Sequence, residues 1–168
     1  MRYFLRLATK SAWTGAANPT HEQRERAKNN FRLREDERGL SVWEFNDEEE
    51  LKLVLAAISC QRQRSGHIDY LEVDEVTIHG LGQVASTVGQ TPVTKANSLH
   101  RELCWSQQQL DALADTLIAN GKVATRAKRS DVRGFVSALD DGDVDDSLRD
   151  WLATQREKHA EQEAKKKR

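Results

Sequence analysis

Apolar and polar positions alternate with a period of two at several places in the first half of this chain of 168 residues. The clearest stretch is 40–45, where Leu40, Val42 and Glu44 alternate with Ser41, Trp43 and Phe45. Because alternate side chains of an extended chain point to opposite faces, this period predicts strands. We expect strands at 2–9, 40–45 and 67–73, with 76–79 continuing the last strand or lying beside it.

Three helix starts are marked by a capping residue that stands three positions before Glu or Gln. They are Thr20, Asn46 and Ser106. The side chain of such a residue accepts a hydrogen bond from a free N–H of the first helical turn, and the Glu or Gln side chain bonds back to the cap. Apolar residues then follow at intervals of three and four, although the apolar face after Thr20 is thin. We predict helices at about 20–30, 46–64 and 106–120.

Two further helices are predicted in the C-terminal part. The first begins at Ser130 or Asp131 and carries apolar residues at positions 132, 135, 136 and 139. The last helix has Leu148, Trp151 and Leu152 as its apolar anchors, and after Ala153 it is polar apart from alanine. Because such a helix has no apolar face to bury, we expect 154–168 to project into solvent, to end in a mobile basic tail and to be dispensable for folding.

These elements predict an α+β fold, with a small sheet and crossing helices in the N-terminal half and a helical C-terminal half that ends in a charged projecting helix. We expect an α+β domain at 1–121 and a helical extension at 122–168. A single domain that continues to about residue 153 is the alternative. Residues 80–96 contain Gly, Ser, Thr and Pro without a period, which predicts a long loop or a loose β-excursion.

Composition limits the classes of protein to which the chain can belong. Charged residues make up 32% of the chain and hydrophobic residues 38%, which predicts a strongly solvated surface over a compact core. No apolar run approaches the ~18 residues that a membrane span needs, and the N-terminus lacks the apolar stretch of a secretion signal. We expect Cys60 and Cys104 to be reduced, mostly buried thiols of a cytoplasmic protein without a membrane partner.

Motifs that bind metals or cofactors, or that carry out catalysis, do not emerge from the sequence. Asp141, Asp143 and Asp145 have the spacing of a calcium loop, but the sixth and twelfth positions lack the glycine and glutamate that such a loop needs. The histidines and cysteines do not have the spacing of a zinc site. Phosphate-binding glycine loops and the nucleophile elbow are missing as well. We therefore predict no metal, no cofactor and no catalytic residue.

One order of residues keeps an enzyme among the alternatives. Arg6 lies on the first predicted strand, Ser41 on the second, and Glu72 near the end of a later strand. This order resembles that of ADP-ribosyltransferase-like folds, in which an arginine, a serine and an acidic residue on successive strands hold and activate a nicotinamide dinucleotide. Ser41 stands without the Ser-Thr-Ser strand of that family. The resemblance implies either an enzyme with Arg6, Ser41 and Glu72 as catalytic residues or an inactive relative.

Charge is segregated along the chain although the net charge is only −1. Basic residues gather where the helix after Ser106 ends and the next helix begins: Lys122, Arg126, Lys128, Arg129 and Arg133. A basic connector between two helices suits contact with the phosphates of RNA or DNA, because such charges dominate the affinity for nucleic acid. Binding of nucleic acid through this connector is therefore one alternative function.

The function that the sequence favours is that of a small intracellular accessory protein that docks to a protein partner and has no chemistry of its own. Trp151, flanked by Leu148 and Leu152, is the aromatic residue whose helix has least else to pack with. Large aromatic side chains dominate the energetics of many interfaces, so these three residues are the expected partner-binding set. The sequence leaves the oligomeric state open.

Overall fold

The computed structural model has an α+β fold that ends in a C-terminal helix, as the sequence predicts. It describes residues 1–16, 18–64 and 66–166. Lys167 and Arg168, the last two residues of the predicted basic tail, lie outside the described residues.

Contacts divide the chain into two units, each assembled from three segments. Unit 1 consists of Met1–Asn46, Asp69–Thr87 and His100–Arg126, and unit 2 consists of Asp47–Ile68, Val88–Leu99 and Ala127–Arg168. The division therefore differs from the expected boundary near residue 121. The reason is that helix α2 (Glu48–Gln61) packs against helix α5 (Arg129–Ser137) and so belongs with the C-terminal helices.

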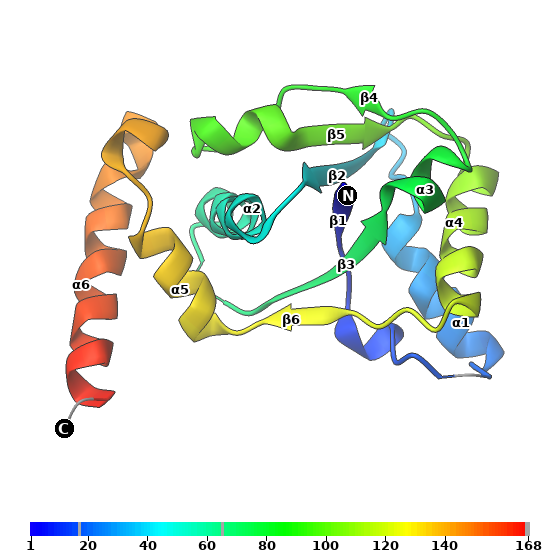
Figure 1. Ribbon diagram of the computed structural model, residues 1–168, viewed down its shortest axis with the longest axis horizontal. Helices are drawn as coiled ribbons and strands as arrows, with labels where there is room; N and C mark the ends of the chain where they lie inside the picture. Colours follow the sequence, from blue (N-terminus) through cyan, green and yellow to red (C-terminus); the bar gives the residue numbers. More distant parts are fainter. Residues whose placement is uncertain (17, 65, 167–168) are drawn as a thin grey trace. The chain divides into compact units, whose positions relative to one another are not determined.

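A six-stranded sheet is the frame of unit 1 among the described residues (Figure 1). Its strands are, in spatial order, β4 (Ala85–Ser86), β5 (His100–Leu103), β2 (Leu40–Phe45), β1 (Tyr3–Leu7), β3 (Ile68–Asp74) and β6 (Thr125–Ala127). β1 pairs with β2 and β3, and β5 pairs with β2 and β4, all antiparallel. The predicted strands are confirmed at the centre of the sheet as β1, β2 and β3. The other strands have two to four residues, which is too few to show a period in the sequence.

Capping boxes begin the two longer helices of unit 1. α1 (His21–Lys28) starts after Thr20 and α4 (Gln107–Ala119) after Ser106, and in each the cap and the third helical residue exchange hydrogen bonds. Both predictions are therefore confirmed. The remaining short 3-10 segments of this unit are η1 (Lys10–Ala12) and η2 (Asn29–Phe31).

The prediction of a strand at 76–79 is wrong. These residues belong to a short helix, α3 (Glu75–His79). The Asp74 carboxylate accepts hydrogen bonds from the backbone N–H and the hydroxyl of Thr77, at 2.8 and 2.9 Å. This cap ends β3 and starts a helix where the apolar alternation alone suggested more strand.

The register of the sheet places one set of apolar residues on the side where α1 and α4 pack, while the buried Leu5, Trp43 and Phe45 lie on the opposite face. Phe4 lies opposite Val73 on β3, and Leu40 lies opposite Leu103 on β5. All four side chains are buried in one core with residues of α1 and α4. This hydrophobic cluster therefore lies between one face of the sheet and these two helices, which also contact each other.

Unit 2 is a group of three helices with shorter 3-10 segments among the described residues. α5 contacts α2 on one side and α6 (Arg149–Lys166) on the other, so it lies between them (Figure 1). The 3-10 segments are η3 (Thr94–Leu99), η4 (Asp141–Asp143) and η5 (Asp146–Leu148). The region predicted as a long loop or a loose β-excursion, 80–96, contains the short strand β4 and ends in η3.

Two helices of unit 2 begin at different residues from those predicted. Asp47, not Asn46, caps α2, and its carboxylate accepts a hydrogen bond from the N–H of Glu50 at 2.9 Å. α5 begins one or two residues before the predicted cap, after Lys128, which makes no side-chain cap bond. The first turn of α5 therefore keeps backbone N–H groups that no cap side chain satisfies.

The first turns of α6 are packed, not projecting. Leu152 and the preceding Leu148 have no exposed surface, and Gln155 is only 5% exposed. The hydrophobic pattern of the sequence ends at Leu152, because residue 155 is polar. The Gln155 side chain is nevertheless buried. The expected projection of the helix from residue 154 onward is therefore wrong for its first residues.

Arg156 fastens α6 to the end of α5 and the turn after it. Its guanidinium donates to the carbonyl oxygens of Ser137 and Leu139 and forms an ion pair with Asp141, with 2.8 Å between Nη1 and Oδ1. Polar contacts of this kind replace the missing apolar face. Deleting 154–168 would remove these contacts, so the deletion should lower the stability of the fold, contrary to the prediction from the sequence.

Candidate anion-binding site

A cavity of about 640 Å³ lies in unit 2, between the turn after α2, the start of α5 and the first turns of α6. It is lined by Gln63, Arg64, Gly66, His67, Arg129, Arg133, Trp151, Gln155 and Lys158. Three arginines and one lysine in this lining are cationic at neutral pH, and none of the nine residues is a carboxylic acid. Its volume is in the range of ligand-binding sites, and its charge favours an anionic ligand.

Helical spacing brings the lining residues of α5 and α6 onto two facing sides. Arg129 and Arg133 are four residues apart, and therefore lie on the same face of α5. Trp151, Gln155 and Lys158 are spaced by four and three residues on α6 and share a face in the same way. Because α5 and α6 contact each other, the cavity has two arginines on one wall and an aromatic ring with a lysine on the other.

Gln63 and Arg64, shortly after α2, belong to a third wall, and hydrogen bonds hold the backbone of Arg64. Gln63 has a φ of 45°, which is uncommon for a residue other than glycine. The Arg64 N–H donates to the Ser59 carbonyl at 3.2 Å, and the Ser59 hydroxyl donates to the Arg64 carbonyl at 3.1 Å. This pair of bonds fixes the position of Arg64, whose side chain is exposed at the cavity.

Arg133 is the most deeply buried charge of this cavity. Arg133 is only 4% exposed, and its Nε has no hydrogen-bond partner among the described residues. Buried polar groups are nearly always hydrogen-bonded, and leaving one unsatisfied costs about 1–3 kcal/mol. This atom has no surface open to the cavity, so an anion bound there would lie beside the guanidinium and would reach Nε only after the Arg133 side chain moves.

Trp151 is more exposed than the other tryptophans. Trp13, Trp43 and Trp105 are 2%, 7% and 6% exposed, whereas Trp151 is half-buried and lines the cavity. An indole ring offers an apolar face on which a flat ring can stack. The cavity therefore combines cations for an anionic group with one surface for a planar apolar group.

A second cavity of unit 2, of about 310 Å³, differs in chemistry. Its lining includes Leu53, Phe135 and Leu139 together with both acidic and basic residues. Its two lysines, Lys52 and Lys95, form ion pairs with neighbouring carboxylates. Four carboxylates and two lysines line this cavity, so its net charge is negative and it does not favour an anion.

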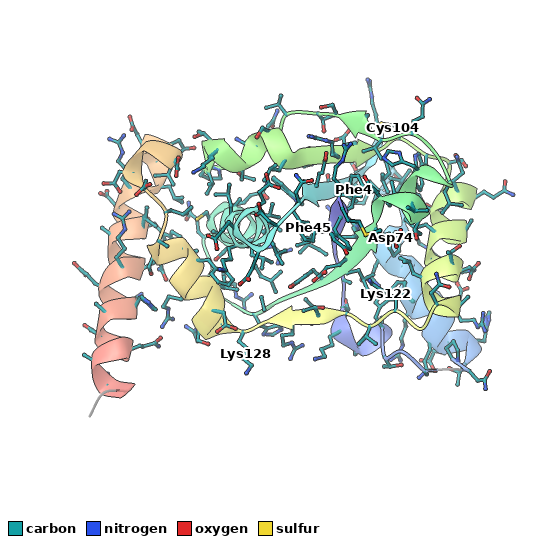
Figure 2. All side chains as sticks on the ribbon, in the orientation of Figure 1. Phe4, Phe45, Asp74, Cys104, Lys122 and Lys128 are labelled. Atoms are coloured by element: carbon teal, nitrogen blue, oxygen red, sulfur yellow. The ribbon has the colours of Figure 1, made fainter. Side chains whose placement is uncertain are left out.

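The structure divides the predicted basic connector between the two units. Lys122 and Arg126 belong to unit 1, and Lys128, Arg129 and Arg133 belong to unit 2. Lys128 stands at the start of α5 and is exposed, while Lys122 follows α4 (Figure 2). Of the five residues, Arg129 and Arg133 line the basic cavity.

The charge of Arg126 is already paired within unit 1. Its Nε and Nη2 donate to the two carboxylate oxygens of Asp69 at 2.6 and 2.8 Å. This bidentate hydrogen bond raises the pKa of Arg126 and neutralises its charge locally. Arg126 is therefore less available to a phosphate than Arg129.

The residues predicted to bind a protein partner do not form a surface together. Leu148 and Leu152 have no exposed area, because they belong to the core of unit 2. Trp151 alone is accessible, and it faces the basic cavity. A partner could therefore not use the two leucines without opening the unit.

The residues that resemble an ADP-ribosyltransferase site are not brought together. Arg6 and Glu72 lie on neighbouring strands one residue out of register, so their side chains are on opposite faces of the sheet. The Arg6 guanidinium donates to the carbonyl oxygens of Asn30 and Ser41, at 2.8 to 3.0 Å. Burial lowers the pKa of Arg6 to about 10, so the group stays charged at neutral pH and links β1, β2 and η2.

Six cavity residues lie outside the sets that the sequence predicts: Gln63, Arg64, Gly66, His67, Gln155 and Lys158. Gln155 and Lys158 could have been predicted from the sequence, because their spacing after Trp151 places all three residues on one face of a helix. Arg64 and His67 reach the cavity only because α2 packs on α5, and that contact joins residues far apart in the chain.

Comparisons with protein-family models, with curated proteins and with solved structures give no match. Within the part of the chain that the structure describes, no helix is long and apolar enough to cross a membrane. The same part holds no group of three or more His, Cys, Asp or Glu side chains that could bind a metal ion. The basic cavity of unit 2 is therefore the feature from which a function can be proposed.

Proposed function

We propose that this protein binds nucleic acid, and that the basic cavity of unit 2 holds phosphate groups of the bound strand. The observation that carries the proposal is a cavity whose lining holds four cations, the buried Arg133 among them, and no carboxylate. Arginine presents a planar fork of donors that matches the oxygens of a phosphate. The role is one of binding, in which the side chains hold the ligand by charge and hydrogen bonds.

Docking to a protein partner has less support as a function. Its predicted anchors Leu148 and Leu152 are fully buried, and the accessible Trp151 lies among cations. The connector alternative is supported in a narrower form. Arg129 and Arg133 line the cavity, whereas Arg126 is paired with Asp69 in unit 1.

The test is a binding titration followed by fluorescence anisotropy, with a labelled oligothymidylate of about 12 nucleotides as the probe. We expect saturable binding that weakens as salt is raised from about 50 mM to about 200 mM, because phosphate contacts release counterions. Each phosphate contact contributes about 0.7 to the slope of log affinity against log salt for a single strand.

Matched variants locate the binding site. Arg129→Ala should weaken binding and reduce the salt slope by about one contact, since this side chain is exposed at the cavity. Arg126→Ala is the control, because it removes an arginine three residues away whose charge is paired with Asp69. Deletion of 164–168 is a second control, which removes charge from the tail but no cavity residue.

The proposal fails if the wild-type protein does not bind the probe at low salt. It fails equally if the tail deletion abolishes binding while Arg129→Ala leaves both affinity and salt slope unchanged. A loss in Arg126→Ala that equals the loss in Arg129→Ala would show that the charge of the whole connector, not the cavity, attracts the strand.

A further inference from the structure

The depth of Arg133 restricts which phosphate can reach it. Arg133 is only 4% exposed, whereas Arg64, Arg129 and Lys158, which line the same cavity, are exposed. A ligand oxygen must therefore be inserted into the cavity to contact Arg133. An internal phosphate is linked to a nucleotide on each side, so the strand would have to enter and leave the cavity to place that phosphate at Arg133. A terminal phosphate is linked to a nucleotide on one side only, so the strand needs only to enter the cavity.

The charge of the cavity fits a terminal phosphate for a second reason. Such a group carries close to two negative charges at neutral pH and has three strong acceptor oxygens. An internal phosphodiester carries one charge and has two free oxygens. The cavity offers four cationic side chains, and the positive end of the α5 macrodipole lies at Arg129.

Trp151 supplies a site for the group next to that phosphate. The indole is half-buried and lines the same cavity as Arg133. Stacking of a base on an aromatic side chain contributes strongly to the binding of single strands and tolerates any base. The buried amide of Gln155 lies on the same face of α6, one turn from Trp151.

From these observations we infer that the cavity binds the terminal phosphate of a nucleotide, with the phosphate against Arg133 and the adjoining base stacked on Trp151. The inference rests on the proposed function and narrows it: the strand is held by its phosphorylated end. The exposed Arg64 and Lys158 then contact the next phosphates of the strand outside the cavity.

The experiment compares unlabelled single strands of one sequence that carry a 5′-phosphate, a 3′-phosphate or two hydroxyl ends. Binding is followed by the intrinsic tryptophan fluorescence of the full chain. Because Trp13, Trp43 and Trp105 are buried, quenching by a stacked base should come from Trp151. We expect one of the phosphorylated strands to bind about tenfold more tightly than the strand with hydroxyl ends. The Trp151 variants lack this reporter, so their binding is measured by competition with the labelled oligothymidylate in fluorescence anisotropy, and Trp151→Phe should keep the preference.

Variants test whether Arg133 binds the phosphate and whether Trp151 binds the base. Arg133→Lys, which keeps a charge but loses the planar fork, should reduce the preference for the phosphorylated end, and Trp151→Ala should weaken binding of every strand by about tenfold. Circular dichroism and thermal unfolding of each variant check that it is folded. The comparison of strands on the wild-type protein needs no variant and stands if one of them does not fold.

The outcomes separate this inference from the function on which it rests. Equal, salt-dependent binding of all three strands would overturn the terminal-phosphate inference and leave nucleic-acid binding intact. Absence of binding to every strand would overturn both. A free nucleoside monophosphate is the fourth ligand, and we expect it to bind about tenfold more weakly than the phosphorylated strand, because it lacks the outer phosphates. Equal affinity for that nucleotide would overturn the assignment to a strand end.

Discussion

Replacing Arg133 by methionine should make the unliganded protein more stable. The native side chain holds a buried guanidinium whose Nε has no partner among the described residues, in surroundings with three other cations. Methionine has a similar length and keeps the apolar stem in place, but it brings no charge and no donor. Replacing a buried charged group by an apolar one of similar volume is often neutral or stabilising.

The magnitude follows from the cost of one buried donor that is left unsatisfied, which is about 1–3 kcal/mol. Allowing for imperfect packing of the new side chain, we expect the free energy of unfolding to rise by about 1 kcal/mol. For a chain of this size that raises the melting temperature by about 2–4 °C. Urea unfolding followed by circular dichroism measures the free energy, and a thermal scan measures the shift.

Arg156→Met is the matched control, since it makes the same chemical change in the same unit. The Arg156 guanidinium is bonded to two backbone carbonyls and to Asp141. Its removal should lower the free energy of unfolding by about 1–3 kcal/mol, opposite in sign to the effect at Arg133. At one fixed concentration, an oligonucleotide should stabilise the wild type and Arg156→Met more than Arg133→Met, because the loss of Arg133 weakens binding. If Arg133→Met is less stable than the wild type by 1 kcal/mol or more, about the size of the expected gain, Arg133 is a structural residue and the reasoning is refuted.

Three further predictions concern the fold itself. Leu152→Ala should lower the free energy of unfolding by about 2–5 kcal/mol, because this side chain has no exposed surface; a change within experimental error would show that α6 is not anchored there. Asp74→Ala should cost about 1 kcal/mol at neutral pH through loss of the α3 cap. Hydrogen bonds from Thr77 lower the pKa of Asp74, so this stabilisation is present above the unfolded-state pKa of about 3.9 and is lost as pH falls through the folded-state pKa. The difference between wild type and variant in acid unfolding should therefore shrink below about pH 4, and a constant difference would argue against the cap. Burial raises the pKa of Cys60 to about 12, so a thiol reagent should label the exposed Cys104 in the folded protein and both cysteines after unfolding; equal labelling rates in the folded state would contradict this burial.

Local signals in the sequence predicted the elements well where one cap or one period decides the structure. Thr20 and Ser106 each begin a helix with the expected exchange of hydrogen bonds, and 40–45 is a strand with the expected faces. The errors arose where a second local signal competed. Asp74 and Thr77 form a cap inside an apolar alternation, and the cap determines the structure.

The candidate site was predicted only in part, because it depends on contacts between distant segments. Arg129, Arg133 and Trp151 were each singled out, but as members of two different surfaces. Packing of α5 between α2 and α6 joins them in one cavity and adds Arg64 from the turn after α2. The sequence also does not show which charges of the connector are paired. Arg126 is paired with Asp69, a carboxylate far away in the sequence.

The measurement that tests the cavity most directly is the NMR signal of the Arg133 Nε–H group. A buried guanidinium N–H without a partner should give a signal that disappears in Arg133→Met and is thereby assigned. Titration with the phosphorylated single strand should shift this signal in a saturable way, with the same affinity as the tryptophan fluorescence, because a phosphate bound beside the guanidinium changes the surroundings of the Nε–H. A signal that stays in place while the strand binds and other residues respond would contradict the proposal that this cavity holds the phosphate.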